Sequence, residues 1–557
     1  MQHQKIKMVM SKNSDSAIEN KLYALTTQII SETNGITLND TLELLLQADE
    51  VEKSQEILKV LTEFQTKLGQ FQQDQIDIAE LLSHPFAGAL CRFFTEFPLN
   101  YREEHIHLTG SLDSSFIFPR LKALLNGPQK EVIYKKIQSI YGESAEEINS
   151  EEDVEKLILL KETDRFDVYL KKLLLPKLIL TDRKAHQDAA YHLAETLHKK
   201  YNVGMIRLKF TFDRSTTDES EKIPGLDVLT SEEVVLGLYD GFKEYQKRVS
   251  RFQFILAPSF RKESAYYDSS KYPNKKAHFE AQVDEILRIV STYPEIAPHL
   301  CEVDTVGNET NHYRKSHFNE MRVGLRRLQY KGFKIRSHHG EVWRTLRRGI
   351  QAVDNAMNIW HIDTLEHGLS LGINPNYYFH SLFQRLMRNN KRSEPIQPGT
   401  LDAQEVEEME WGDNTEISKK LLAGQPLNEK ETLKFMKAKF HTAREVEHYQ
   451  HDVLNRMINK EVSLIALPSS NQRLTGYIKD FKDHPFSWWE KKGVSLGVGT
   501  DNYVTLNTNF VQEMLILLLT DPADLKITKL LMVTTGESRR PLISEYFWQM
   551  RKKLKDL

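Results

Sequence analysis

Short apolar segments alternate with longer helical stretches eight times along this chain, and this repetition restricts the fold more than any other feature. A strand followed by a helix, repeated in this way, is typical of a parallel sheet that closes into a barrel. An open doubly wound sheet competes, but no glycine-rich dinucleotide fingerprint supports it. The sequence therefore predicts an α/β fold, a TIM-type (β/α)8 barrel with strands at residues 103–111, 203–212, 252–257, 298–306, 333–338, 362–367, 462–467 and 494–500.

The first 95 residues lack this alternation and show helical spacing instead. Ile18, Leu22 and Leu25 fall on one helix face, and Thr37 or Asn39 can cap a second helix. We therefore expect a helical N-terminal extension, residues 1–95, that packs on a barrel domain formed by residues 96–557.

Two connections are longer than a plain barrel requires. Residues 110–202 separate the first two strands, and residues 374–455 form an insertion between strands six and seven. Both leave from the carboxyl ends of strands, the face on which barrel enzymes build their sites. We expect the insertion to form a helical arm. The roles open to this arm are a lid, a subunit contact and decoration of the barrel rim. His441, His448 and His451 lack a carboxylate in a metal-binding arrangement, so we expect them on a helix surface.

The composition is that of a globular chain. Among 557 residues the formal net charge is −3, which gives no global attraction to nucleic acid or to an acidic membrane. Cys91 and Cys301 are the only cysteines, which indicates a reducing compartment and excludes a thiolate-rich metal site. The N-terminus lacks the apolar core of a signal peptide, and no apolar run is long enough to span a membrane. We expect a cytoplasmic protein with a small-molecule partner, and homo-oligomers stay open.

Histidine and carboxylate residues stand at the ends of four predicted strands. His105 and His107 are two positions apart, so their side chains share one face of an extended strand. The other three strand ends read His338-His339-Gly340-Glu341, Glu366-His367-Gly368 and Thr500-Asp501-Asn502. Polar residues are common at strand ends, but the carboxyl ends of barrel strands meet on one face. These residues therefore indicate one shared site.

The chemistry of this set suits Zn²⁺. Two histidines from strand one, His338 or His339 from strand five, and Asp501 supply three nitrogens and one oxygen, with room for water. Bound zinc lowers the pKa of water from ~15.7 toward ~7. A remaining histidine and Glu341 can move protons without occupying the metal. We therefore expect one zinc ion per chain.

These segments resemble the signature segments of the adenosine deaminase family. The match comprises residues 105–111, 338–341, 367–368 and 500–502, with further matches at 304–309 (Asp-Thr-Val-Gly-Asn-Glu), 468–471 (Pro-Ser-Ser-Asn) and 484–485 (His-Pro). The zinc ligands that the resemblance implies are His105, His107, His338 and Asp501. Alanine is usual in the family at position 339, and the spacing to Glu341 favours His338 as the ligand, with His339 packed behind the site.

The resemblance also implies catalytic and substrate-binding roles. Glu341 would protonate the purine ring nitrogen next to the reacting carbon, and His367 would orient or deprotonate the attacking water. Gly307 would offer its backbone N–H to the purine. Thr109 replaces an aspartate that contacts the ribose 5′-hydroxyl, and Asn502 replaces an aspartate that donates to the purine N7. Asn502 can still donate through its NH₂ group.

The leading hypothesis is zinc-dependent hydrolytic deamination of an aminopurine nucleoside, adenosine to inosine with release of ammonia. The alternatives are deamination of AMP or of an N6-modified adenine nucleotide, another amidohydrolase reaction, and a binding protein that has lost catalysis. Thr109 removes the repulsion that a carboxylate would exert on a 5′-phosphate. Arg120 and Arg214 are the candidate phosphate ligands, but they form no dedicated cluster, so adenosine is favoured.

Overall fold

The computed structural model describes residues 17–145, 148–161, 164, 166–213 and 229–555. Its centre is one sheet of eight parallel strands that pair in chain order. The strands are β1 (Tyr101–His107), β2 (Val203–Thr211), β3 (Gln253–Arg261), β4 (Glu302–Val306), β5 (Lys334–His339), β6 (Thr364–His367), β7 (Ser463–Ala466) and β8 (Leu496–Val498). The predicted (β/α)8 barrel is confirmed.

The barrel closes where the chain that leaves β8 meets β1. The backbone N–H of Asp501 donates to the carbonyl of His105 at 2.9 Å, and the N–H of His107 donates to the carbonyl of Asp501 at 2.8 Å. This parallel bridge lies at the carboxyl end of β1. Closure therefore brings Asp501 beside the His-x-His pair, although the two lie at opposite ends of the barrel sequence.

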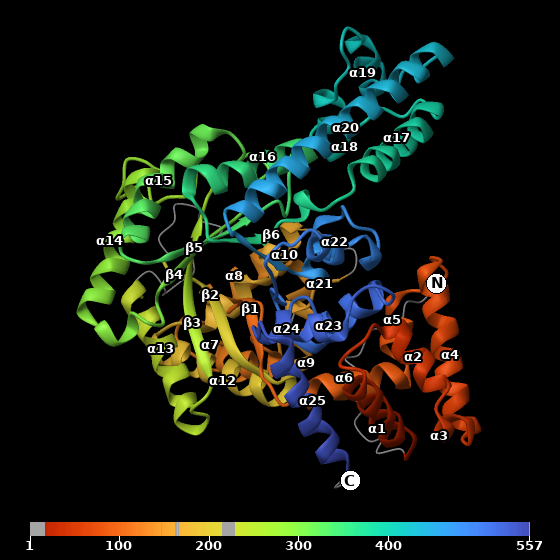
Figure 1. Cartoon of the computed structure of the whole chain (residues 1–557). Helices are drawn as coiled ribbons and strands as arrows, with labels where there is room; N and C mark the ends of the chain where they lie inside the picture. Colours follow the sequence, from red (N-terminus) through yellow and green to blue (C-terminus); the bar gives the residue numbers. More distant parts are fainter. Residues whose placement is uncertain (1–16, 146–147, 162–163, 165, 214–228, 556–557) are drawn as a thin grey trace.

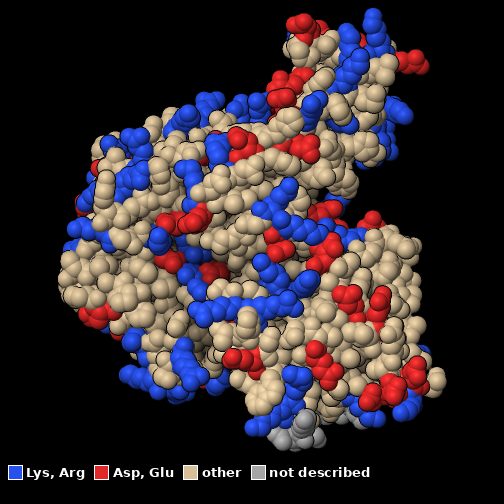
Figure 2. All heavy atoms as spheres, in the orientation of Figure 1, with Lys and Arg blue, Asp and Glu red and all other residues tan. Residues whose placement is uncertain are grey.

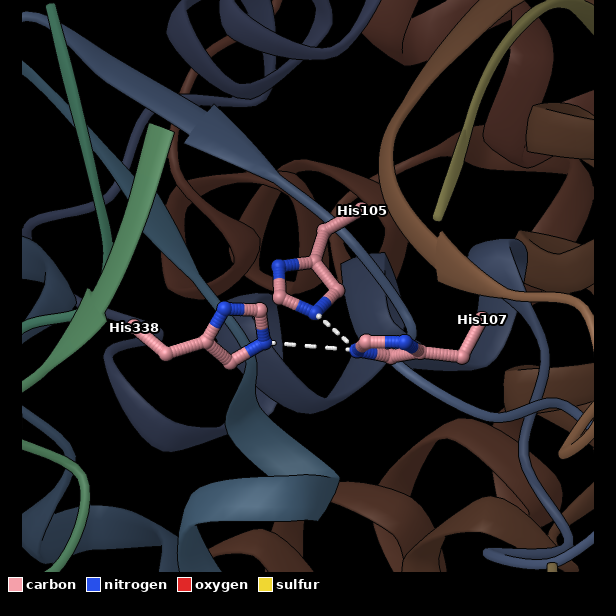
Figure 3. Close-up of side chains that lie close together, drawn as sticks. All are labelled: His105, His107 and His338. Carbon is pink, nitrogen blue, oxygen red and sulfur yellow. Dashed lines mark hydrogen bonds between the residues drawn. The ribbon is translucent and has the colours of Figure 1, made fainter. Parts of the chain in front are cut away.

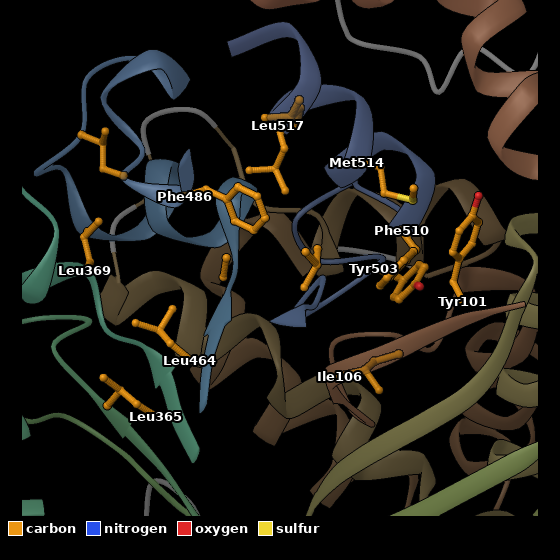
Figure 4. Packing of buried hydrophobic residues seen from close by; sticks show 14 of the residues in the cluster. Tyr101, Ile106, Leu365, Leu369, Leu464, Phe486, Tyr503, Phe510, Met514 and Leu517 are labelled. Carbon is orange, nitrogen blue, oxygen red and sulfur yellow. The ribbon is translucent and has the colours of Figure 1, made fainter. Parts of the chain in front are cut away.

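Helices cover the outside of the barrel (Figure 1). They include α13 (Ser231–Arg248), α14 (Lys275–Thr292), α15 (Lys315–Tyr330), α16 (Leu346–Asn355), α21 (Pro468–Thr475), α22 (Phe486–Lys491), α23 (Phe510–Thr520), α24 (Ile527–Thr535) and α25 (Arg540–Lys555). A continuous hydrophobic core joins them to the strands. In it the ring of Tyr101 on β1 stacks on Phe510 of α23 with a centroid separation of 5.5 Å, and Ile106 belongs to the same cluster (Figure 4). None of the described helices has both the length and the apolar character of a membrane span.

The N-terminal region is helical, as its apolar spacing predicts. Its helices are α1 (Ala17–Glu32), α2 (Leu38–Leu46), α3 (Asp49–Glu52), α4 (Gln55–Gln72), α5 (Ile78–Leu82) and α6 (Pro85–Thr95). The side chain of Thr37 caps α2 by accepting a hydrogen bond from the N–H of Asp40. Gln72 donates to the carbonyl of Leu519 at 3.2 Å. The extension therefore packs against the C-terminal helices.

The long connection from β1 to β2 is also helical. It comprises α7 (Ser114–Leu125), α8 (Lys130–Tyr141), α9 (Glu151–Ile158), α10 (Phe166–Lys172), α11 (Leu174–Ile179) and α12 (Arg183–Tyr201). Tyr141 connects α10 and α11. Its hydroxyl donates to the carbonyl of Lys171 at 3.2 Å and accepts from the N–H of Leu175 at 3.1 Å.

The connection from β6 to β7 projects from the barrel as an arm (Figure 1). We use "the arm" for its four helices, α17 (Pro375–Lys391), α18 (Leu401–Glu408), α19 (Thr415–Leu422) and α20 (Glu429–Asn459). Acidic and basic side chains are interspersed over its visible surface (Figure 2). His441, His448 and His451 are exposed on α20, as expected from the sequence.

Candidate metal centre

Three imidazole rings converge inside the carboxyl end of the barrel. His105 and His107 come from β1 and His338 comes from β5 (Figure 3). Nε2 of His107 lies 3.2 Å from Nε2 of His105 and 3.3 Å from Nε2 of His338. In a tetrahedral zinc site with Zn–N bonds of ~2.0–2.1 Å, neighbouring ligand atoms lie roughly 3.3 Å apart. Nε2 of His107 therefore lies at the separation from the other two nitrogens that one zinc ion requires.

Asp501 supplies the fourth candidate ligand. Its Oδ1 lies 3.6 Å from Nε2 of His107 and 3.8 Å from Nε2 of His105, and its Oδ2 accepts a hydrogen bond from Ser470 at 2.6 Å. Burial raises the pKa of Asp501 to about 7. The surrounding protein groups therefore stabilise the ionised carboxylate only in part, and a bound divalent cation would supply the missing stabilisation.

Buried carboxylates orient two of the rings. Nδ1 of His105 lies 2.8 Å from Glu366 on β6, and Nδ1 of His338 lies 3.1 Å from Asp304 on β4. Each Nδ1–H donates to its carboxylate, which leaves Nε2 with a lone pair that points at the other rings. Burial holds the pKa of both histidines well below the usual range, so both rings are neutral. Converging lone pairs repel each other unless a cation lies between them, and this donor set fits zinc.

One lysine joins the two orienting carboxylates. Lys209 projects from β2 into the barrel, and its Nζ lies 3.0 Å from Asp304 and 2.8 Å from Glu366. The side chain is fully buried. Arg336, whose Nε lies 2.6 Å from Glu366, supplies a second positive charge, so the two carboxylates beneath the site are balanced by two cations. Sequence reasoning missed this residue, although a lysine inside the apolar segment 203–212 was the available signal.

Glu341 lies on the turn that follows β5. The carboxylate of Glu309 accepts hydrogen bonds from the N–H groups of Gly340, Glu341 and Val342 at 2.9, 2.7 and 2.9 Å, which fixes this turn. Burial, followed by the charge of Glu309, raises the pKa of Glu341 to about 8. A carboxyl group that keeps its proton near neutral pH can act as a general acid.

His367 ends β6 with a φ of 64°, a left-handed conformation that is rare for a residue with a Cβ. Its Nδ1 lies 2.9 Å from the amide oxygen of Asn471, and Asn471 Nδ2 lies 3.1 Å from Nε2 of His484. Nε2 of His367 has no hydrogen-bond partner among the described residues and lies 3.8 Å from Glu341. With Nδ1 as donor to Asn471, Nε2 is free to accept a proton.

His339 lies behind the centre and points away from the other rings. Its ring packs against Phe318 and Trp360, and Nδ1 lies 2.7 Å from Ser337 Oγ. Among the described residues, His338 belongs to a group of side chains close enough to share a metal, and His339 belongs to no such group. This arrangement favours His338 as the strand-five ligand.

The residues expected to contact substrate follow the carboxyl ends of β1, β4 and β8. Thr109 is half-buried on the turn after β1. Gly307 has a φ of 107°, and a Cβ there would lie 2.2 Å from the Glu263 carboxylate, so only glycine fits. Asn502 is fully buried, and its Nδ2 donates to Asp501 Oδ1 and to the Tyr169 hydroxyl, both at 2.5 Å.

The two arginines considered as phosphate ligands do not strengthen that role. Arg120 pairs with Asp188 at 3.1 Å and lies over the ring of Phe116. Arg214 lies outside the described residues.

Comparisons with known proteins give weak likenesses. No protein-family model and no curated protein matches the chain. The adenine deaminase of Arthrobacter aurescens has a TM-score of 0.46 and 12% identity, covering 82% of this chain and 99% of its own. The N6-methyl-AMP deaminase of Arabidopsis thaliana has a TM-score of 0.44 and 14% identity, with coverages of 82% and 96%. An amidohydrolase from Burkholderia ambifaria with bound zinc has a TM-score of 0.43 and 12% identity, with coverages of 82% and 93%. Likenesses this weak leave the activity open.

Proposed function

We propose that the chain is a member of the adenosine deaminase family and removes the amino group of an aminopurine nucleoside by zinc-dependent hydrolysis. The observation that carries this proposal is the convergence of His105, His107, His338 and Asp501 beside a buried acid, Glu341. A binding protein that had lost catalysis would have no need to retain an acid with a raised pKa.

The side chains divide the chemistry between them. A zinc ion held by the four ligands would supply an activated water and Lewis acidity. Because Asn471 holds Nδ1 of His367, the opposite nitrogen, Nε2, would orient a water and accept a proton from it. Glu341 donates a proton to the ring nitrogen beside the carbon under attack. The carboxyl group is held in place through the turn that Glu309 fixes, so little reorganisation is needed when charge develops.

Adenosine is the substrate we propose first. Thr109 stands where related proteins carry a carboxylate, and its hydroxyl can donate to a phosphate as well as accept from an alcohol. Deamination of AMP or of an N6-modified adenine nucleotide is therefore the second candidate. We expect weaker discrimination against 5′-phosphorylated substrates than an aspartate at position 109 would give.

The test is a substrate screen followed by one substitution. Adenosine, deoxyadenosine, AMP and N6-methyl-AMP are each incubated with the zinc-loaded protein. Adenine-type absorbance is measured together with the leaving group, which is ammonia for the first three and methylamine for N6-methyl-AMP. Thr109→Asp should then raise the ratio of kcat/KM for adenosine over AMP, because the new carboxylate repels the phosphate. An unchanged ratio would show that position 109 does not face the sugar. Release of neither ammonia nor methylamine from any of the four substrates would refute the proposed function.

A further inference from the structure

A tyrosine hydroxyl reaches the candidate metal centre from outside the barrel strands. Tyr169 lies on α10, in the connection between β1 and β2. It is buried, and its hydroxyl lies 2.5 Å from Nδ2 of Asn502. No recognised motif contains this residue, and none of the roles described above uses it.

Asn502 connects this hydroxyl to a candidate zinc ligand. One Nδ2–H donates to the Tyr169 hydroxyl and the other to Asp501 Oδ1, which lies 2.5 Å away. On its other side, Asn502 Oδ1 packs so closely on Gly110 that a Cβ there would lie 1.5 Å from it. Both amide hydrogens of Asn502 are therefore engaged, and its orientation depends on Tyr169.

Apolar contacts seat α10 over the site. Tyr169 belongs to a small hydrophobic cluster, separate from the main core, with Leu160, Leu474 and Leu506. Backbone contacts reinforce it, since the N–H of Leu160 donates to the carbonyl of Thr505 at 2.9 Å. Arg473 donates to the carbonyl of Leu160 at the same distance. These contacts therefore hold α10 against the segments that follow β7 and β8, which carry Ser470 and Asp501.

The charges around the hydroxyl agree with this position. Burial raises the pKa of Tyr169 well above its usual range, and the carboxylates of Asp501 and Glu341 raise it further. The hydroxyl therefore keeps its proton at any pH at which the protein works. It accepts from Asn502 and retains one O–H to donate toward the carboxylate side of the site.

We propose that Tyr169 is a positioning residue of the metal centre: acting through Asn502, it fixes the carboxylate of Asp501 in the orientation that binds zinc. This inference rests on the metal centre and the function proposed above. Partners one step beyond the ligands typically change metal affinity by about 10–100-fold. Because Ser470 also holds the Asp501 carboxylate, we expect the lower end of that range.

The experiment measures the zinc dissociation constant of the full chain by competition with a chelating dye at fixed pH. Four variants are compared with the wild type: Tyr169→Phe, Asn502→Ala, the double variant that combines them, and Tyr141→Phe. Tyr141 is the matched control, because its hydroxyl holds the carboxyl end of α10 at Lys171 without touching the centre. Thermal unfolding of the apo proteins checks that each variant folds.

We expect Tyr169→Phe to weaken zinc binding about tenfold. The double variant should lose less zinc affinity than the sum of the two single losses, because Tyr169 and Asn502 act on the same carboxylate. Tyr141→Phe should bind like the wild type. Binding by Tyr169→Phe within twofold of the wild type would overturn the inference, as would additive losses in the double variant or an equal loss in Tyr141→Phe.

The Asn502→Ala comparison keeps the test decisive if Tyr169→Phe fails to fold. The inference requires the hydrogen bond to Asp501, so an undiminished zinc affinity in Asn502→Ala also overturns it. A wild-type protein that binds no zinc would instead refute the metal centre itself, which separates failure of this inference from failure of the proposed function.

Discussion

Glu366 accepts a hydrogen bond from Nδ1 of His105 at 2.8 Å, and this contact determines which nitrogen of His105 faces the metal. Both side chains are completely buried. A carboxylate that fixes the tautomer of a histidine ligand also raises its basicity. The affinity of the site should therefore depend on Glu366 almost as strongly as on the ligands themselves.

Glu366→Gln should weaken zinc binding about 10–100-fold, because a neutral amide holds the ring less firmly and lowers its basicity. The matched control is Glu302→Gln. Glu302 lies in the same buried charge network and pairs with Arg207 and Arg336, but it contacts no candidate ligand. Zinc titration of both variants checks the prediction, and equal losses in the two would contradict it.

The neighbouring histidines of strand five should behave differently. His338→Ala should abolish tight zinc binding, because its Nε2 is one of the three converging nitrogens. His339→Ala should retain zinc and lose on the order of 1–3 kcal/mol of stability, since it removes a ring packed against Phe318 and Trp360. Metal content and thermal unfolding give the two readouts. If His339→Ala lost its metal while His338→Ala kept it, the ligand from strand five would be His339 and not His338.

Glu341 should set the alkaline limit of activity. A general acid works only while it is protonated, and burial together with Glu309 raises the pKa of Glu341 to about 8. Its protonated fraction falls as pH rises through about 8, so kcat/KM should fall on the alkaline side. Glu341→Gln should keep its zinc, lose at least ~100-fold in activity and show no such alkaline decline.

The control for the pH profile is Glu405→Gln. Glu405 is another buried carboxyl group, with a pKa raised to about 7 by burial, but it lies on the arm. Its substitution should leave the alkaline decline in place. Near-normal turnover by Glu341→Gln would be incompatible with the proposed acid.

The barrel and the candidate ligands could be predicted from the sequence because each depends on a local pattern. His105 and His107 share a strand face by spacing alone, and the rule that barrel strands end on one face brings Asp501 to them. The supporting residues could not be predicted in this way. Lys209 contacts Asp304 and Glu366 only because these side chains, from β2, β4 and β6, all point into the interior of one closed barrel.

The long connections between strands were the other part of the structure that the sequence could not predict in detail. Apolar spacing predicts that residues 110–202 and 374–455 are helical, but it does not state which surface each helix covers. The contact of Tyr169 with Asn502 therefore has no signature in the sequence. The same holds for the arm, whose Glu408 contacts Arg344 and Thr345, shortly after Glu341 in the chain.

The arm should support catalysis through Glu408. This residue accepts hydrogen bonds from Arg344 at 3.2 Å and from Arg348 at 2.8 Å, so it anchors the chain just after Glu341. Glu408→Ala should lower kcat/KM roughly tenfold through misplacement of the acid, with zinc content unchanged. Glu410→Ala is the control, because Glu410 forms an exposed pair with Arg347 and should have little effect. Equal kinetics for the two variants would leave the arm without a catalytic role.

The most direct test of the central claim measures zinc and ammonia on the same preparation. The wild-type chain should contain close to one zinc ion and release ammonia from adenosine, and His107→Ala should lose both. Removal of zinc by a chelator should stop ammonia release, and added zinc should restore it. A zinc-loaded wild-type protein that releases no ammonia from adenosine, deoxyadenosine or AMP, and no methylamine from N6-methyl-AMP, would contradict the account.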